Sequence, residues 1–558
     1  MLVHSLPADI LCAIFAALKE IHPTRQTVQS HAGTKRDAHL QRLGWLVVTF
    51  VNQRWRSVAL DYAALWSDLC IHLGPEWLQI FVSRSKDSAL TYDDMGAGSR
   101  DKTLLARHDA CTSVLPTHMH RMRMIRLHTA SQRLVQAALA PPAPVLESLT
   151  IFGDLSMSVP IFAGQVPRLR SLTLGAYPRQ AGSLLRLDAQ PGILHGLTSL
   201  QLNIYGDEPP VTILGILRHT KRLEALSLVV RSASTAIIPA IIHPDHMDGQ
   251  PAALPALKTC TLDGRIDGVA HLVSHLIIPI SVAMTILCES SSFLPSDSTV
   301  LRQLLDGLAA WRWGYGNGPS APFRVARLES DPNGTATLKL ATHSAVEALS
   351  PFVLPPDNYF TLSLKQSLRG HDRDFTQPTI YSDILPTLFS EGEALHVCAE
   401  GTYGTILRQH LRCRLPDLKH ICSSLFGHNV IGPDLDPFPS LQVMHLINPS
   451  SFNYAEMERF TTASEPERTS PCYNWHCLRS NLQERRSAGL ILERIVIYQD
   501  ISGFMRRESD PALQPYQVPA PHGMMPQWLS DRYTTVKAFM EDVIEIETVQ
   551  TTEPFWKA

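Results

Sequence analysis

Apolar residues recur at helical spacing directly after a Leu6-Pro7 pair near the start of the chain. Proline suits the first turn of a helix, where its missing N–H leaves no hydrogen bond unmade, and Asp9 lies near the positive end of the helix dipole. The pattern therefore predicts a helix that begins at this pair. Its apolar stripe is broad enough to contact more than one neighbour, and it consists of Ile10, Leu11, Ile14, Phe15 and Leu18.

A second apolar helix is predicted from about Gly44, after a polar stretch from His22 to Arg42 that has the composition of a loop. Because the residues between its main apolar positions are apolar too, most of the circumference is predicted to avoid water. Such a helix can bury one side and offer another to a partner. One face carries Val48, Val51, Trp55 and Val58, and the remainder carries Leu46, Val47 and Phe50.

From Val145 onward one short sequence motif, which we call the leucine word, returns along the chain. It has leucine at its first position, usually leucine or another apolar residue at its fourth, and in the full copies an apolar residue at its sixth. The first four copies recur at roughly 23 to 28 residues, close to the period of leucine-rich repeats. Later intervals are longer and uneven. The copies are Leu146–Ile151, Leu169–Leu174, Leu197–Leu202, Leu223–Leu228, Leu257–Leu262, Leu441–Leu446 and Leu492–Ile497, with a weaker one at Leu418–Ile421.

Within the word, apolar residues alternate with other residues, which predicts a short strand whose apolar face points inward. Stacked units would bury a continuous core and form a laterally extended, roughly parallel sheet. Helical spacing at Ile213–Leu217 and Val300–Trp311 predicts the return limbs between strands. The expected core leucines are Leu149, Leu172, Leu200 and Leu226, and the expected outward residues are Thr150, Thr173, Gln201 and Ser227.

Four segments are expected along the chain. They are a helical segment at 1–72, a helical junction with the first divergent turns at 73–144, irregular repeats at 145–510, and a proline-rich segment with a C-terminal helix at 511–558. That last helix is predicted over Trp528–Val549. The number of repeats between Gly264 and Pro437 is left open by the pattern.

Composition favours a folded soluble protein that binds other proteins. With 44% hydrophobic residues, a formal charge of -3 and a pI near 6.8, there is no electrostatic reason to bind nucleic acid or an anionic membrane. The longest apolar run, Leu276–Leu287, contains Pro279 and is shorter than the roughly 20 residues of a membrane helix. The cysteines are spread singly, so we expect reduced thiols and a cytoplasmic and/or nuclear protein.

Three short motifs contain metal-binding or phosphate-binding residue types, and each is incomplete. His271 and His275 are one helical turn apart but lack a neighbouring glutamate. Cys472–Cys477, predicted to be a loop, has no second pair at zinc-finger spacing. Gly314–Gly318 lacks the lysine and serine of a phosphate loop. We therefore expect no catalytic residue, no metal and no cofactor. Since catalytic groups can meet from distant positions, a hydrolase with a site in 264–437 remains an alternative.

The start of the chain resembles the F-box in the form common among mushroom-type fungal proteins. The matching order is Leu6-Pro7, Ile10-Leu11, Ile14-Phe15, then Val51–Leu60 and Leu65-Trp66-Ser67, so the segment 1–72 is the expected F-box. Asn52 stands where the family often has cysteine, and the stretch between the two helical parts is longer than in compact F-boxes. The later words resemble the divergent leucine-rich repeats found behind such F-boxes. The implied fold is α/β: a helical F-box followed by an irregular leucine-rich-repeat solenoid with a short parallel sheet.

By this resemblance, the F-box would dock on a Skp-type adaptor and through it on a cullin. The repeats would bind an unknown protein target, so that the chain recruits substrates for a ubiquitin ligase without being an enzyme. An alternative keeps the fold but places it in a scaffold that does not conjugate ubiquitin. The expected adaptor-binding residues are Leu6, Pro7, Ile10, Leu11, Ile14, Phe15, Val48 and Trp55, and the expected target-binding residues are Thr173, Gln201, Ser227 and His445.

Overall fold

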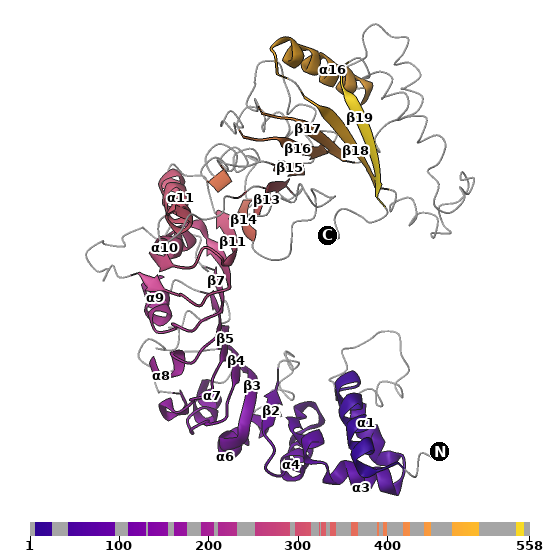
Figure 1. The fold of residues 1–558 in the computed structure, drawn as a ribbon. Helices are drawn as coiled ribbons and strands as arrows, with labels where there is room; N and C mark the ends of the chain where they lie inside the picture. Colours follow the sequence, from indigo (N-terminus) through magenta and orange to yellow (C-terminus); the bar gives the residue numbers. More distant parts are fainter. Residues whose placement is uncertain are drawn as a thin grey trace. The chain divides into compact units, whose positions relative to one another are not determined.

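The computed structural model has a mixed α/β fold with a large, mostly parallel sheet (Figure 1). Contacts divide the chain into two compact units. Unit 1 is Met1–Thr259 with His275–Ile278, and unit 2 is Cys260–Ser274 with Pro279–Ala558. The structure describes residues 6–24, 43–94, 110–129, 132–153, 161–175, 191–205, 210–231, 251–290, 296–313, 323, 325–330, 335–341, 359–366, 388–389, 394–398, 417–424, 440–447, 471–490, 492–500 and 543–551.

Unit 1 begins with short helices: α1 (Ala8–Ile21), η2 (Gly44–Phe50), α3 (Gln53–Asp61) and η3 (Ala63–Trp66). The predicted first helix is confirmed as α1, which begins directly after Pro7. The prediction of one continuous second helix is wrong. Asn52 is extended, with φ -162° and ψ 172°, and its Oδ1 accepts a hydrogen bond from the Trp55 N–H at 2.8 Å. Asn52 therefore ends the 3-10 helix η2 and caps the α-helix α3.

Three parallel strands join this helical segment to the repeated words. β1 pairs with β2, and β2 pairs with β3. The elements in chain order are β1 (Asp68–Leu69), η4 (Ile71–Leu73), α4 (Pro75–Arg84), β2 (Leu90–Asp93), α6 (Leu115–His118), η6 (Met119–Arg121), β3 (Met122–Thr129) and α7 (Gln132–Ala138).

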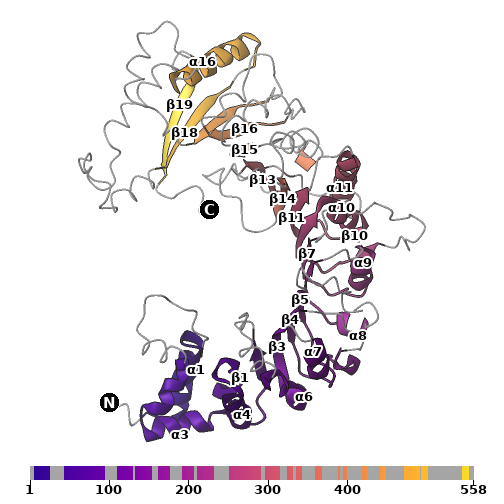
Figure 2. The ribbon, with the colours of Figure 1, turned by 180° about the vertical axis from the view of Figure 1, so that it is seen from behind.

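The repeated words become adjacent parallel strands in matched register. Leu149, Leu172, Leu200 and Leu226 are successive Cα partners and are all at most 2% exposed, which confirms their predicted burial. Helices lie along one side of these strands (Figures 1 and 2). The elements are β4 (Ser148–Gly153), η7 (Ile161–Gly164), β5 (Ser171–Gly175), α8 (Pro191–Leu194), β6 (Ser199–Tyr205), α9 (Pro210–Arg218), β7 (Ala225–Arg231) and β8 (Ala252–Ala253).

In unit 2 one strand reverses the otherwise parallel pairing. The strands from β11 onward pair in the order β11-β14-β13-β12-β15-β16-β17-β18-β19, and β13 is antiparallel to both neighbours. The strands are β9 (Thr259–Arg265), β11 (Ala283–Ser290), β12 (Val325–Ser330), β13 (Thr335–Ala341), β14 (Tyr359–Gln366), β15 (Ala394–Cys398), β16 (His420–Ser424), β17 (Val443–Ile447), β18 (Arg494–Asp500) and β19 (Glu545–Thr551). The strand β10 (Leu276–Ile277) pairs with β8 and belongs to unit 1. The helices are α10 (Ile266–His275), α11 (Ser296–Trp313) and α16 (Pro471–Ser487).

Two predictions near the C-terminus are wrong where the structure describes them. The last residues of the predicted helix Trp528–Val549 belong to strand β19, which pairs in parallel with β18 from Glu545 to Thr551. The neighbouring Ile544 is only 7% exposed. Residues 528–542 lie outside the described part of the chain. The predicted loop Cys472–Cys477 lies in α16, where Pro471 occupies the first position, which tolerates a missing N–H.

Candidate interaction sites

Four of the eight residues predicted to bind an adaptor pack inside the helical segment. Leu11 and Phe15 of α1 are 0% exposed and Val48 of η2 is 1% exposed. Trp55 of α3 is half-buried, and its ring meets that of Phe15 edge-on at 5.3 Å between centroids. Leu11, Phe15 and Val48 hold α1 against its neighbours, because these buried side chains are not available to a partner.

The other four residues lie at the surface or close to it. Ile10 and Ile14 are 44% and 41% exposed, Pro7 is exposed and Leu6 is half-buried. Residues four positions apart share a helix face, so Ile10 and Ile14 form one outward stripe beside the buried Leu11 and Phe15. α1 therefore has two apolar stripes, and the outward one consists of Ile10, Ala13, Ile14, Ala17 and Ile21, all exposed.

Phe50 and Val51 are exposed apolar residues that the sequence analysis assigned to a helix and not to a binding site. They are 65% and 56% exposed, whereas the adjacent Thr49 is 9% exposed. The change from η2 to α3 at Asn52 leaves both outside the core. Among the described residues, six of the seven large hydrophobic side chains that are exposed lie between Ile10 and Ile80. Exposed apolar side chains therefore concentrate in the helical segment.

An aromatic cluster continues the core of the helical segment into the first strand layer. Trp45 of η2, Trp66 of η3 and Phe81 of α4 meet edge-on, with centroid distances of 5.2 Å for Trp45 to Trp66 and 5.0 Å for Trp66 to Phe81. The Trp66 Nε1–H donates to the Ala59 carbonyl at 2.8 Å, so its polar atom is satisfied in the core. This core does not stop at residue 72, because Phe81 belongs to it.

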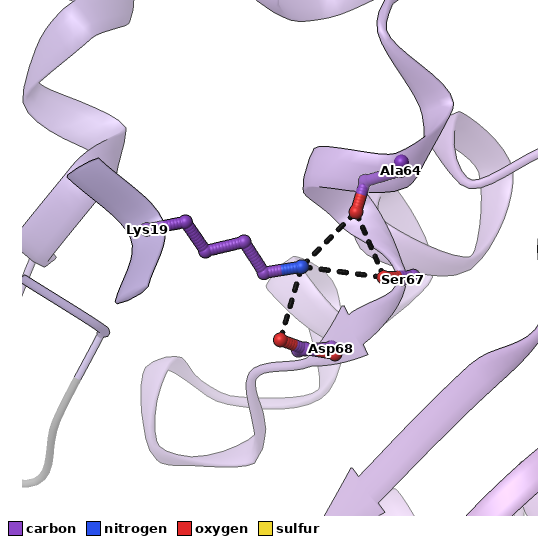
Figure 3. Close-up of polar contacts among 4 residues, drawn as sticks. All are labelled: Lys19, Ala64, Ser67 and Asp68. Atoms are coloured by element: carbon purple, nitrogen blue, oxygen red, sulfur yellow. Dashed lines mark hydrogen bonds and ion pairs between the residues drawn. The ribbon is translucent and has the colours of Figure 1, made fainter. Parts of the chain in front are cut away.

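Lys19 connects α1 to the beginning of the sheet (Figure 3). Its Nζ donates to the Ala64 carbonyl at 3.0 Å and to Ser67 Oγ at 3.2 Å, and it pairs with Asp68 Oδ2 at 3.0 Å. Three acceptors match the three N–H donors of an ammonium group. The Lys19 side chain is 16% exposed and that of Asp68 is 55% exposed, so the contact joins α1 to β1 while water still reaches the carboxylate.

Three of the predicted target-binding residues form one row across unit 1. Thr173, Gln201 and Ser227 are successive Cα partners on β5, β6 and β7, and Thr150 of β4 precedes them in the same row. All four are partly exposed while the aliphatic residues on either side are buried, which confirms their outward direction. We call Thr150, Thr173, Gln201 and Ser227 the central row.

His445 does not belong to this row. It lies on β17 in unit 2, where its Cα partners are Cys422 and Val496. Its side chain lies outside what the structure describes. Of the four predicted target-binding residues, the structure therefore places Thr173, Gln201 and Ser227 in one row of unit 1 and His445 on a strand of unit 2.

An ion pair between Arg126 and Asp93 lies at one end of the central row. Arg126 of β3 is the Cα partner of Thr150 and pairs with Asp93 Oδ2 of β2 at 3.2 Å. The next residue, Asp94, is 1% exposed and its Oδ1 accepts the His128 N–H. Burial raises the pKa of the Asp94 carboxyl to about 7, against the lowering effect of the His128 N–H, and the nearby Asp93 raises it further.

The motifs considered for metal binding occupy helices. His271 and His275 lie on α10, with His271 7% exposed. Across the described ranges, no group of three or more His, Cys, Asp or Glu residues is arranged to hold a metal ion. In the same part of the chain, no helix is both long and apolar enough to cross a membrane. Gly314–Gly318 and most of the stretch 342–416 lie outside the described residues, so the hydrolase alternative for 264–437 stays a prediction.

No known protein-family model matches this chain, and a search of curated proteins found no match.

Proposed function

We propose that this chain recruits protein substrates to a Skp–cullin–F-box ubiquitin ligase. In this proposal the helices α1 to η3 are an F-box that docks on the adaptor, and the repeated strands are a leucine-rich-repeat solenoid that holds the target. The conjugating enzyme bound to the cullin would supply the chemistry. The chain itself would contribute by bringing substrate and enzyme together, which raises their effective concentration.

The outward stripe of α1 is the observation that carries the proposal. Ile10 and Ile14 belong to the residue order that resembles an F-box, and both are more than 40% exposed. Burying a large aliphatic side chain fully contributes roughly 1.5–3 kcal/mol. About two fifths of each isoleucine is still exposed, so covering both would contribute on the order of 1–2.5 kcal/mol. Exposed apolar patches of this kind are typical of protein interaction sites.

The strand register supports the repeat part of the proposal. Equivalent leucines of consecutive words are direct Cα partners, as with Leu149, Leu172 and Leu200. In a stacked repeat each unit completes its core with its neighbours, and the alternate residues form an extended binding surface. The adaptor surface and the target surface would then be separate and could be changed independently.

The test is adaptor binding by an Ile10→Asp, Ile14→Asp variant of the full chain. A carboxylate buried at an apolar interface without a partner costs several kcal/mol, so the affinity for a purified Skp-type adaptor should fall by at least about 100-fold. Titration calorimetry would measure it. Far-UV circular dichroism should stay unchanged and the melting temperature should fall only slightly, because both side chains lie at the surface and the change mainly lowers helix propensity.

Ile280→Asp is the matched control. Ile280 is 43% exposed, close to the 44% of Ile10, and it lies in unit 2. The control should bind the adaptor like the wild type. Deleting the first seventy residues would be a poorer test, because it would remove Trp66 from its contact with Phe81. Wild-type protein that does not bind the adaptor at micromolar concentration would refute the proposal.

A scaffold without ubiquitin chemistry uses the same two surfaces. Both functions predict adaptor binding, so that measurement cannot separate them. Co-purification of a cullin with the wild-type chain, lost in the Ile10→Asp, Ile14→Asp variant, supports the ligase. Adaptor without cullin supports the scaffold.

A further inference from the structure

The segments of unit 1 that lead into β3 to β7 and β9 carry a concentration of positive charge. They are residues 119–123, 139–147, 165–170, 195–198, 219–224 and 254–258. Together they contain seven lysines and arginines but only two acidic residues, Glu147 and Glu224. The whole chain has 49 basic and 52 acidic residues, so its small net charge conceals this uneven distribution.

Backbone hydrogen bonds place these six segments side by side. One residue of each segment donates its N–H to the carbonyl of its counterpart in the segment before it, at 2.8 or 2.9 Å. Neighbouring strands lie about 4.8 Å apart, so the backbones of the first and last counterparts are roughly 24 Å apart. Residues from distant parts of the sequence therefore line one edge of the sheet. The counterparts, in order, are Arg123, Glu147, Arg170, Thr198, Glu224 and Lys258.

Six of the seven cations on this edge are exposed. The seventh, Arg121, is partly buried and donates to the Val82 carbonyl at 3.0 Å and to Ser85 Oγ at 2.6 Å, so it belongs to the fold. We call the six exposed cations the basic edge, and they are Arg123, Arg168, Arg170, Lys221, Arg222 and Lys258.

Most cations of the basic edge have no anionic partner. Lys258 pairs with Glu224 at 2.6 Å, and Arg170 donates to the Gly196 carbonyl at 2.9 Å. Within the described ranges, no ion pair involves any of the other four. Unpaired cations gathered on one surface produce a positive potential that attracts anions. Guanidinium groups in particular bind carboxylates through two parallel hydrogen bonds.

The distribution of charge along the edge favours separate carboxylates over a continuous polyanion. Glu147 lies between Arg123 and Arg170, and Glu224 precedes Lys258, so an evenly charged nucleic-acid backbone would face two carboxylates of the protein. Single-stranded nucleic acids also stack on aromatic side chains, and the six segments contain no Phe, Tyr or Trp. The cations lie on separate segments, so spaced single charges match them better than one phosphate dianion.

We propose that the basic edge binds an acidic segment of another protein. The carboxylates of that segment pair with the unpaired arginines, and Arg168 and Arg222 each hold one of them. An extended segment of about eight residues covers the roughly 24 Å of the edge. This surface shares no residue with the outward stripe of α1. The inference goes beyond the proposed function, because the edge binds such a segment whether or not the chain docks on an adaptor.

Fluorescence anisotropy with the purified full chain tests the proposal without any adaptor. The probe is a labelled peptide of about ten residues in which aspartate alternates with serine. A comparison peptide carries asparagine in place of each aspartate. The aspartate peptide should bind at least about tenfold more tightly, and its affinity should fall as the salt concentration rises, because exposed ion pairs are screened.

The variant Arg168→Glu, Arg222→Glu should bind the aspartate peptide at least about tenfold more weakly, because two attractive charges become repulsive. The matched control is Arg56→Glu, Arg302→Glu, which changes the net charge equally at exposed positions of α3 and α11. The control should stay within about twofold of the wild type. Both variants should keep the wild-type melting temperature, because all four side chains are exposed.

Three results would overturn the proposal. They are a wild-type chain that does not bind the aspartate peptide at micromolar concentration, equal binding of the asparagine peptide, and equal losses in the edge variant and the control. The last result would assign binding to overall charge.

Other anions are measured in parallel. They are a phosphoserine peptide of equal net charge, a single-stranded oligonucleotide of equal charge, and vesicles that contain phosphatidylserine. If one of them binds more tightly than the aspartate peptide and is lost in Arg168→Glu, Arg222→Glu, it replaces the acidic segment as the ligand of this edge.

Discussion

The helical segment and the strands β4 to β7 use apolar residues in opposite ways. On the strands, large apolar residues such as Leu172 point inward and the outward positions are mostly small and polar. On α1, the inward residues Leu11 and Phe15 lie beside the exposed Ile10 and Ile14. The strands bury their large aliphatic residues within the chain, whereas the helical segment leaves several of its own exposed. Hydrophobic content alone does not separate a core from an interface, because only the packing shows which stripe is covered.

Under the proposed function, this difference would give two kinds of binding. The outward stripe of α1 would offer apolar area to the adaptor. The partly exposed Thr150, Thr173, Gln201 and Ser227 of β4 to β7 would offer hydrogen-bonding groups to the target. The predictions below test the strand side, the place where the two regions meet, and the helical side.

Leu172→Ala should have the largest effect on stability. Leu172 is 0% exposed and its Cα partners are Leu149 and Leu200, so the truncation leaves a cavity in a shared core and should cost about 2–5 kcal/mol. The neighbouring Thr173→Ala should change stability by less than about 0.5 kcal/mol. Urea unfolding measures both. Equal losses of unfolding free energy in the two variants would contradict the assignment of Leu172 to the core and of Thr173 to the outward row.

Asp94 should make stability depend on pH where β2 meets β3. Its pKa in the folded chain, about 7, lies above the ordinary 3.8, so the fold prefers the protonated carboxyl. That contribution is complete below about pH 4 and is lost as the pH rises through 7, by up to about 4 kcal/mol. Asp94→Asn stays neutral and can still accept the His128 N–H, so it should remove this loss.

The measurement compares urea unfolding of wild type and Asp94→Asn at about pH 5 and about pH 8. The variant should be the more stable protein at the higher pH, and the difference should shrink at the lower one. The neighbours Asp93, Arg126 and His128 are present in both proteins, so their contributions to stability largely cancel in the comparison. A difference that does not change with pH would contradict the raised pKa.

Asn52→Ala should give a smaller loss in the helical segment. Removing an N-cap side chain costs about 1 kcal/mol, here through the hydrogen bond that Asn52 Oδ1 accepts from the Trp55 N–H. Asn52→Ser and Asn52→Asp should recover most of it, because both can cap a helix. Thermal unfolding followed by circular dichroism measures the series. An Asn52→Ala variant that is as stable as the wild type would show that the cap does not stabilise this junction. The packing of Trp55 would then be what ends η2.

Much of the strand layer could be predicted from the sequence because its information is local. The leucine word predicts both a strand and the direction of each side chain, and Leu149, Leu172, Leu200 and Leu226 lie where it placed them. The same word at Leu441–Leu446 and Leu492–Ile497 marks β17 and β18. Predictions failed where local pattern competes with tertiary pairing. The residues Glu545–Thr551 become a strand because β18 offers a free edge for pairing.

By itself, the sequence determined that α1 is apolar on a broad stripe and that the words form strands with leucines inside, since period and burial follow from residue spacing. Only the tertiary structure decided which residues of that stripe are covered: Leu11 and Phe15 meet the helical core, and Ile10 and Ile14 do not. It also decided that the Phe152 ring lies over the backbone of Gly175. These residues are far apart in the chain and meet only through strand register, which the pairing of whole strands sets.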